Sequence, residues 1–252
     1  MAGNQIGSVF RVTTWGESHG AALGAVVDGC PAGIELAEAD IQQALDRRKP
    51  SAAVSSTTRR EKDKVEILSG VFECKTTGTP VSLLIRNSDA ASEAYDELKD
   101  VFRPGQGDYT YLKKYGIRDW RGGGRASGRE TAARVAAGAI AEKVIAAVGM
   151  EVIAYTQAIG AIEIDRAQMP SGKDLRYIVR KSIIFCPDSK AAAAMEKKLA
   201  AVRKEGDSLG GVVEVVVRGC PAGLGEPVFD KMDADLAKAL MSIGSVKAVE
   251  IG

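Results

Sequence analysis

The stretch with the clearest chemical pattern runs from Arg118 to Ala147 and opens with glycines and arginines. Three consecutive glycines lie between Arg121 and Arg125, and Ser127 and Glu130 follow with the S-x-x-E spacing of a helix start. A helix N-terminus presents unpaired backbone N–H groups and a partial positive charge, and glycine lets the backbone approach a ligand closely. This glycine stretch therefore predicts an anion site, with phosphate as the natural anion.

A lone glycine-rich loop has an alternative explanation, because many such loops are tight turns that simply enter a packed helix. The repeated arginines favour the anion site over that alternative: Arg118, Arg121, Arg125, Arg129 and Arg134. No G-K-[ST] follows the glycines, so the stretch is not a P-loop. No clean G-x-G-x-x-G opens the helix either, which excludes the dinucleotide-binding fingerprint.

A second candidate is the turn at 15–20, which carries the only histidine of the chain, His19. The alternating segment before it, 9–14, predicts a strand. A single histidine is more often a structural hydrogen-bonding residue than a catalyst. A glycine-flanked loop directly after a strand is nevertheless where catalytic groups tend to lie, so His19 is a candidate catalytic residue.

Composition limits the other possibilities. The 252 residues include 34 basic and 33 acidic side chains, which leaves a net charge of +1 and no overall field that would favour nucleic acid or a membrane surface. Cys30, Cys74, Cys186 and Cys220 show no C-x-x-C spacing, which argues against a zinc site or a redox pair and fits a reducing compartment. Without a long apolar run or a signal layout at the start, the sequence predicts a cytoplasmic protein.

The periodicity predicts the elements that must position these residues. A strand is expected at 25–28, followed by a turn and by a helix at 36–48 with Ile41, Ala44 and Leu45 on its buried face. The segments 51–58 and 100–111 are expected to be loops because of their small, polar and turn-forming residues. The remaining predictions are strands at 65–72, 81–86, 151–162 and 183–185, and a surface helix at 189–204.

The segments 25–48 and 215–242 are an internal repeat. Both contain the pentapeptide GCPAG after an apolar strand, and both continue into a helical pattern with A-D-[IL] and A-L pairs. Two copies cannot form a solenoid, but they predict two related sheet-and-helix units that pack together. The fold class that follows is α+β, with a pseudo-symmetric core of two antiparallel sheets and helices packed around them.

Long ungapped segments of the sequence resemble the chorismate synthase family. They are TTWGESHG, DVFRPG, DYTY, RGGGRASGRETAARVAAGAIA and GCPAGLGEPVFDKMDADLAKALMSI. The resemblance covers almost the whole chain and implies one family domain over 1–252 with a β-α-β sandwich fold. Members of the family continue beyond the position of Gly252, so we expect this chain to be a fragment or a short form that lacks the C-terminal part of the domain.

The resemblance implies a lyase of aromatic amino acid biosynthesis, in the shikimate pathway. The family eliminates phosphate from 5-enolpyruvylshikimate 3-phosphate to give chorismate, and it needs reduced FMN although no net oxidation occurs. NADPH is a further expected ligand, as the reductant of the flavin, and the family suggests a homotetramer. Arginine suits such ligands, because its planar guanidinium binds carboxylates and phosphates with two parallel hydrogen bonds.

The resemblance also assigns roles to individual residues. Ser18 and His19 match the catalytic Ser-His pair, with His19 placed to hydrogen-bond or protonate near the reduced flavin. The positions that match flavin contacts are Arg125, Ala126, Ser127, Gly244 and Ser245. Arg48 matches an arginine that binds the pyridine nucleotide or the substrate, and Arg103 and Arg134 are the further substrate contacts that we expect.

Two positions depart from the family pattern. Gln106 stands where the family has a second histidine that assists the leaving phosphate, and glutamine can donate a hydrogen bond but cannot transfer a proton. Val54 stands where an arginine is expected. These departures keep an alternative open, in which the chain is an FMN-binding paralogue with little or no elimination activity. A flavin reductase that uses a pyridine nucleotide is a third possibility.

Overall fold

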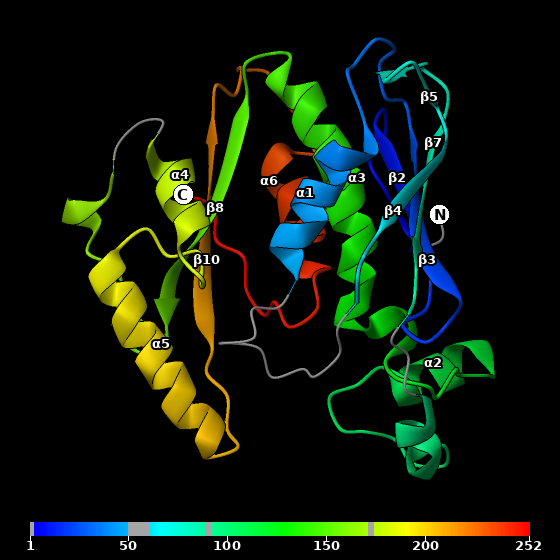
Figure 1. Ribbon diagram of the computed structural model, residues 1–252, viewed down its shortest axis with the longest axis vertical. Coiled ribbons are helices and arrows are strands. Elements are labelled where there is room, and N and C mark those ends of the chain that lie inside the picture. Colours follow the sequence, from blue (N-terminus) through cyan, green and yellow to red (C-terminus); the bar gives the residue numbers. More distant parts are fainter. Residues whose placement is uncertain (1–2, 50–60, 89–91, 171–173) are drawn as a thin grey trace. The chain divides into compact units, whose positions relative to one another are not determined.

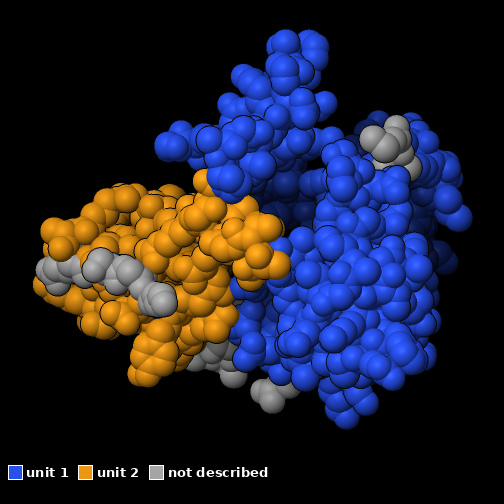
Figure 2. Space-filling model, turned by 90° about the horizontal axis from the view of Figure 1, so that it is seen from above, with its two compact units in different colours: residues 1–49, 59–144, 221–252 blue, residues 50–58, 145–220 orange. Residues whose placement is uncertain are grey.

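The computed structural model describes residues 3–49, 61–88, 92–170 and 174–252, so the predicted loop 51–58 and Val54 lie outside the described residues. The chain divides into two compact units (Figure 2). Unit 1 comprises residues 1–49, 59–144 and 221–252, and unit 2 comprises residues 50–58 and 145–220. The single domain that the resemblance implies stays a prediction.

Unit 1 contains a five-stranded antiparallel sheet (Figure 1) with the strand order β1-β2-β3-β7-β4. Side chains of β3 and β7 alternate between the two faces of the sheet, and one face, which includes Leu23 and Leu83, is completely buried. The strands are β1 (Gln5–Ile6), β2 (Arg11–Gly16), β3 (Ala22–Asp28), β4 (Val65–Ser69) and β7 (Val81–Arg86), and a separate small hairpin joins β5 (Val71–Phe72) to β6 (Lys75–Thr76).

Two helices, α1 (Glu38–Arg48) and α3 (Thr131–Ala146), pack against this sheet. The predicted face of α1, with Ile41, Ala44 and Leu45, is buried as expected. The buried face of α3 is mostly alanine, whose small side chain lets the helix approach closely. The other helical segments of this unit are η1 (Ser92–Leu98), α2 (Asp108–Tyr115), η2 (Gly124–Ala126), η3 (Gly128–Glu130) and α6 (Met232–Met241).

Unit 2 contains a three-stranded antiparallel sheet in the order β10-β8-β9, formed by β8 (Glu151–Ile159), β9 (Ile162–Glu163) and β10 (Gly211–Arg218). One face of the sheet is covered by α4 (Asp174–Lys181) and α5 (Ser189–Lys204), and a short helical turn, η4 (Arg166–Gln168), follows β9. The predicted helix 189–204 is confirmed at both ends. Asp188 caps it by accepting bonds from the backbone N–H groups of Lys190 and Ala191.

The repeated segments share a backbone requirement. Gly29 after β3 and Gly219 after β10 both have positive φ, 78° and 68°. A Cβ at either position would lie within 2.3 Å of a backbone carbonyl, Val9 O in the first copy and Gly149 O in the second. Any other residue would clash there, which explains why GCPAG begins with glycine in both copies. The order of strand, turn and helix is the same in both: β3 leads to α1, and β10 leads to α6.

Antiparallel sheets with packed helices confirm the predicted α+β class. Three local predictions were wrong. The segment 100–111 is not entirely a loop, because α2 begins at Asp108. The segment 183–185 is a turn, in which Phe185 has a positive φ of 56°. The predicted strand 65–72 is divided at Gly70, whose φ is 83°.

Candidate active site

The Ser-His pair lies in the turn that connects β2 to β3. The hydroxyl of Ser18 is 3.0 Å from Nδ1 of His19, and Ser18 is almost completely buried. The rings of His19 and Tyr95 are in T-shaped contact, with 5.1 Å between the ring centroids. These contacts restrict the imidazole on two sides, as a group that exchanges protons in one geometry requires.

The glycine stretch packs directly against this turn. Gly122 has a φ of 63°, and a Cβ placed on it would lie 2.2 Å from Nδ1 of His19 and 2.8 Å from the Ser18 hydroxyl. The backbone N–H of Ser18 also donates to the carbonyl of Gly124, at 3.3 Å. Two segments that the sequence marked separately are therefore adjacent, and the absence of a side chain at 122 makes that contact possible.

Arg125 fixes the glycine stretch to β2. Its Nη1 donates to the carbonyl of Gly16 at 2.9 Å, and its Nη2 donates to the hydroxyl and the carbonyl of Thr14 at 2.7 and 3.1 Å. Nη2 also reaches Oδ1 of Asn4 at 3.2 Å. In this structure the Arg125 side chain therefore binds protein oxygens and holds the loop in place.

A second arginine, Arg103, is paired with the carboxylate of Asp108 at the start of α2. Two nearly equal bonds of 2.9 Å join the guanidinium and the carboxylate, and Arg103 Nη2 donates in addition to the Gly122 carbonyl at 2.8 Å. The Arg103 hydrogen bond lowers the pKa of Asp108 to about 2, with Arg118 contributing further. Arg103 thus connects the loop that contains Gln106 to the glycine that contacts His19.

A chain of polar contacts runs from β2 to the C-terminal segment. The Thr14 hydroxyl donates to Glu130 at 2.7 Å, and the second carboxylate oxygen of Glu130 accepts from Arg134 at 2.7 Å. Arg134 then donates to the hydroxyl of Ser242 at 2.6 Å and to its carbonyl at 3.2 Å. Two predicted flavin segments, Arg125–Ser127 and Gly244–Ser245, are therefore linked through one buried carboxylate.

Another network joins Arg48 to the Ser-His turn. Arg48 donates to Asp63 at 2.7 Å, and Arg129 binds the other carboxylate oxygen of the same residue. Asp63 is completely buried, and both of its oxygens face arginines. Nε of Arg129 donates to Oδ1 of Asn87 at 2.9 Å, and Asn87 in turn contacts the backbone of the turn that holds Ser18.

Sequence reasoning did not find Asp63 or Asn87. Each lies within a run of polar residues beside a strand, at 63 before β4 and at 87 after β7, and neither belongs to a recognisable motif. The positive φ of Asp63, 49°, cannot be read from the sequence. The one available signal was the surplus of arginines at 48 and 129, which need carboxylates if they are buried.

The expected helix N-terminus differs in detail. The Ser127 hydroxyl accepts a bond from the backbone N–H of Arg129, as a capping serine does. The carboxylate of Glu130 does not complete a capping box, since it binds Thr14 and Arg134 instead. Two short 3-10 turns precede α3, which begins at Thr131.

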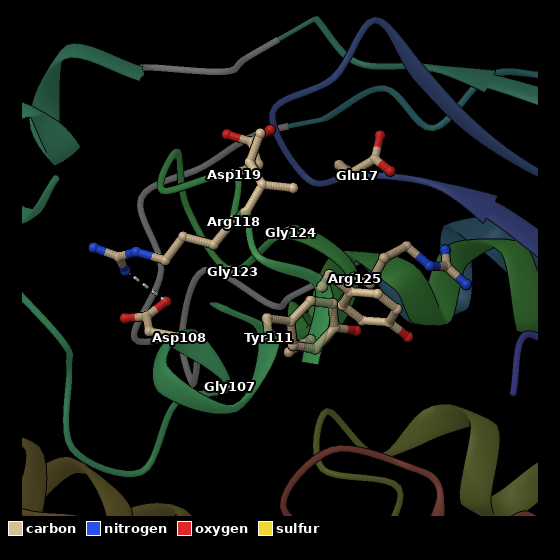
Figure 3. A pocket seen from close by; sticks show the side chains of 12 residues that line it. Glu17, Gly107, Asp108, Tyr111, Arg118, Asp119, Gly123, Gly124 and Arg125 are labelled. Atoms are coloured by element: carbon tan, nitrogen blue, oxygen red, sulfur yellow. Dashed lines mark ion pairs between the residues drawn. The ribbon is translucent and has the colours of Figure 1, made fainter. Parts of the chain in front are cut away.

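A cavity of about 220 Å³ lies between α2 and the glycine stretch (Figure 3). Tyr111 of α2 and the backbone of Gly123 and Gly124 form part of its wall, and Arg125 and Ala126 are the predicted site residues that line it. The full lining comprises Glu17, Gly107, Asp108, Tyr111, Tyr115, Ile117, Arg118, Asp119, Gly123, Gly124, Arg125 and Ala126.

Gln106, Gly244 and Ser245 also belong to unit 1. Gln106 is exposed in the turn before α2, where its backbone N–H donates to the Arg103 carbonyl at 3.3 Å. Gly244 and Ser245 are exposed beyond α6, and a Cβ on Gly244 would meet no atom within 4 Å.

Within the described part of the chain, no helix has the length and apolar character needed to cross a membrane.

The arginines of the site are bound to protein acceptors. The carboxylates of Asp63, Asp108, Asp119 and Glu130 and several backbone carbonyls take their hydrogen bonds. A phosphate-bearing ligand would therefore have to exchange with these partners or bind through backbone N–H groups of the glycine stretch. The anion site remains a prediction.

Comparison with known proteins identifies the family. The family model described as chorismate synthase matches residues 10–252. Chorismate synthase of Syntrophus aciditrophicus is 64% identical over 252 residues, which is all of this chain and 70% of that protein. The enzyme of Methanosarcina barkeri is 56% identical over the whole chain, which covers 68% of that protein.

A solved structure gives the same result for the fold. A crystal structure of chorismate synthase superimposes with a TM-score of 0.78 and 33% sequence identity, over 97% of this chain and 69% of that one. The match of sequence and fold extends over essentially all of the chain, and it includes the segments that form the Ser-His turn and the glycine stretch. The chain therefore belongs to the chorismate synthase family.

Proposed function

We propose that the chain converts 5-enolpyruvylshikimate 3-phosphate to chorismate by eliminating phosphate, with reduced FMN as cofactor. The observation that carries this proposal is the contact of Gly122 with Ser18 and His19, because it brings the glycine stretch that leads into the predicted flavin contacts Arg125–Ser127 to the predicted catalytic pair. The family supports a chorismate-forming role. The roles of the individual residues, and the use of NADPH to reduce the flavin, are part of the proposal.

The residues present fit a flavin phosphate because several glycines leave the backbone accessible. Gly123 and Gly124 expose backbone to the cavity beside α2, and Gly128 and Gly244 have open space where a side chain would be. Arg125–Ser127 and Gly244–Ser245 would hold the cofactor from two sides, kept in register by the contacts from Arg125 through Glu130 to Ser242. When bound, reduced FMN supplies an electron that helps the phosphate to leave and takes it back as the ring proton departs.

His19 is the proton-transfer group in this proposal. Its Nδ1 lies 3.0 Å from the Ser18 hydroxyl. The backbone of Gly122 and the ring of Tyr95 keep the imidazole in one orientation. Histidine suits this task, because its ordinary pKa lies near neutrality and both protonation states are accessible at working pH.

Arginines would orient the substrate anions. Arg48, Arg103 and Arg134 are the residues that we propose for this role, and each is now paired with a carboxylate. Substrate carboxylates or phosphate would share the guanidinium groups with Asp63, Asp108 and Glu130, so these acids limit how far the arginines can move. Positioning of this kind, together with water exclusion, is the protein's main contribution in cofactor enzymes.

The test is anaerobic formation of chorismate with pre-reduced FMN, with flavin affinity measured on the same sample. We expect product from the unchanged chain and at least a hundredfold less from the His19→Ala variant, whose flavin binding should persist. Flavin binding without product in the unchanged chain would instead support the paralogue that has lost elimination. Gln106, which cannot transfer a proton, is the observation that favours this second candidate.

A further inference from the structure

The side chain of Asn87 closes the turn that carries Ser18 and His19. Its Nδ2 donates to the carbonyl of Glu17 at 3.0 Å and to the carbonyl of Gly20 at 2.8 Å. These two carbonyls lie on either side of the Ser-His pair. The backbone N–H of Asn87 adds a third bond, to the carbonyl of Ala21 at 3.1 Å. One residue at the end of β7 therefore holds both ends of the turn.

Arg129 fixes the orientation of this amide. Oδ1 of Asn87 accepts from Nε of Arg129 at 2.9 Å, so the acceptor side of the amide faces the guanidinium and the donor side faces the turn. The Arg129 side chain is 4% exposed and is paired with Asp63, which is completely buried. Because Asp63 also binds Arg48, two arginines and one carboxylate set the direction in which Asn87 donates.

Besides Asn87, the Ser18 N–H holds the turn by donating to the Gly124 carbonyl at 3.3 Å. Between its own residues, the described backbone bond is that of the Gly20 N–H to the Glu17 carbonyl, at 3.2 Å. His19 meanwhile lies against Gly122 so closely that no side chain fits between them. A small movement of the turn would therefore change the position of the imidazole relative to the glycine stretch.

We propose that Asn87 is a positioning residue, whose amide fixes the turn at 17–20 and thereby places Ser18 and His19 against Gly122. It acts through the position of His19. The part of this inference that concerns turnover rests on the proposed function. The part that concerns the geometry of His19 does not.

The first experiment uses the fact that His19 is the only histidine. In the protein labelled at histidine with ¹⁵N and ¹³C, every imidazole NMR signal belongs to this residue, and its titration can be followed directly. Asn87→Asp keeps the shape of the side chain and an acceptor for Arg129 but removes both donors. We expect altered ring shifts and a displaced titration midpoint for His19 in this variant.

Arg86→Ala is the matched control, because Arg86 is the preceding residue, is largely exposed and pairs with Glu66 on a neighbouring strand. The NMR signals of His19 in the Arg86→Ala variant should match those of the unchanged chain. Asn87→Ala removes the same two donors without placing a charge at 87, so a displaced His19 midpoint in this variant reports the geometry of the turn and decides the matter. A titration curve of His19 that coincides with the unchanged one in a folded Asn87 variant would overturn the proposal.

The second experiment measures chorismate formation under the anaerobic conditions given above. In the Asn87 variants we expect kcat to fall roughly tenfold to a hundredfold while KM changes little, since a misplaced catalytic group costs rate more than binding. A rise in KM at constant kcat would contradict a positioning role. If the unchanged chain forms no chorismate, the proposed function fails, and the histidine spectra alone decide the role of Asn87.

Discussion

Gly122 and His19 are in contact, and the space between them cannot admit a methyl group. A Cβ on Gly122 would lie 2.2 Å from Nδ1 and 2.3 Å from Cε1 of the imidazole, and the φ of 63° at this glycine is unfavourable for other residues. The contact joins a turn after the second strand to a loop that precedes a helix of the core. The proposed active site depends on this junction.

Gly122→Ala should therefore damage both stability and the catalytic pair. We expect the free energy of unfolding to fall by roughly 1–3 kcal/mol, because the new methyl group meets His19 and Ser18 and the backbone is strained. Thermal unfolding monitored by circular dichroism measures the loss. Gly128→Ala is the control, since a Cβ there meets no atom within 4 Å. Equal stability of the two variants would show that the contact is not tight.

Gln106→His should raise turnover by roughly 10²–10⁴, the range that a general acid or base supplies. The substitution introduces the histidine that the family resemblance implies at this position, in the exposed turn beside Arg103. Steady-state chorismate formation in the two proteins is the measurement. An unchanged rate would show that glutamine already suffices, or that the leaving phosphate receives its proton elsewhere.

The Asp108–Arg103 pair predicts a pH dependence of stability. The pKa of Asp108 is lowered to about 2 from 3.8, so its ion pair stabilises the fold above about pH 4 and this contribution is lost as the pH falls towards 2. A shift of this size corresponds to about 2 kcal/mol at neutral pH. Urea unfolding between pH 2 and 6 should show a smaller decrease for Asp108→Asn than for the unchanged chain.

The exposed Asp96 provides the control for this measurement, because Asp96→Asn changes an acid in the same unit without removing the Arg103 partner. The stability of the Asp96→Asn variant should change with pH in the same way as that of the unchanged protein. If Asp108→Asn loses stability as steeply as the unchanged protein between pH 4 and 2, the ion pair does not contribute as proposed.

The link between Arg134 and Ser242 predicts an effect on flavin binding. Ser242→Ala removes the hydroxyl that accepts from Arg134, which should loosen the Gly244–Ser245 segment and weaken FMN binding several-fold. Flavin fluorescence quenching gives the affinity. Ser69→Ala removes a similar exposed hydroxyl bond, to the Pro80 carbonyl, and should leave the affinity unchanged. Equal affinities in both variants would remove the C-terminal segment from the proposed flavin site.

The periodicity of apolar residues predicted most helices and strands, because it reflects which side chains of each element are buried. The strands 25–28 and 81–86 and the helix 189–204 all follow from the spacing of apolar residues. Helix α2 was missed because Pro104, Gly105 and Gly107 suggest a continuous loop, although Gly107 is the N-cap of the helix. The turn at 183–185 was mistaken for a strand because three apolar residues in a row carry no period.

The motifs of the candidate site could be predicted from the sequence, but the contacts between them could not. The motifs with Ser18, Arg103 and Arg125 could be marked from the sequence, because residue types that suit chemistry stand in glycine-rich loops. Which carboxylate meets which arginine depends on tertiary contacts, and Asp63 stands far from Arg129 in the sequence. Local sequence patterns do not show which distant residues pair, so Asp63 and Asn87 were found only in the structure.

The most direct test of the account is a single-turnover experiment without oxygen. The protein in excess over 5-enolpyruvylshikimate 3-phosphate is mixed with pre-reduced FMN, and chorismate and inorganic phosphate are quantified together over time. Both products should appear at the same rate and in a ratio of one to one, and His19→Ala should slow both equally. Tight flavin binding with neither product formed would contradict it.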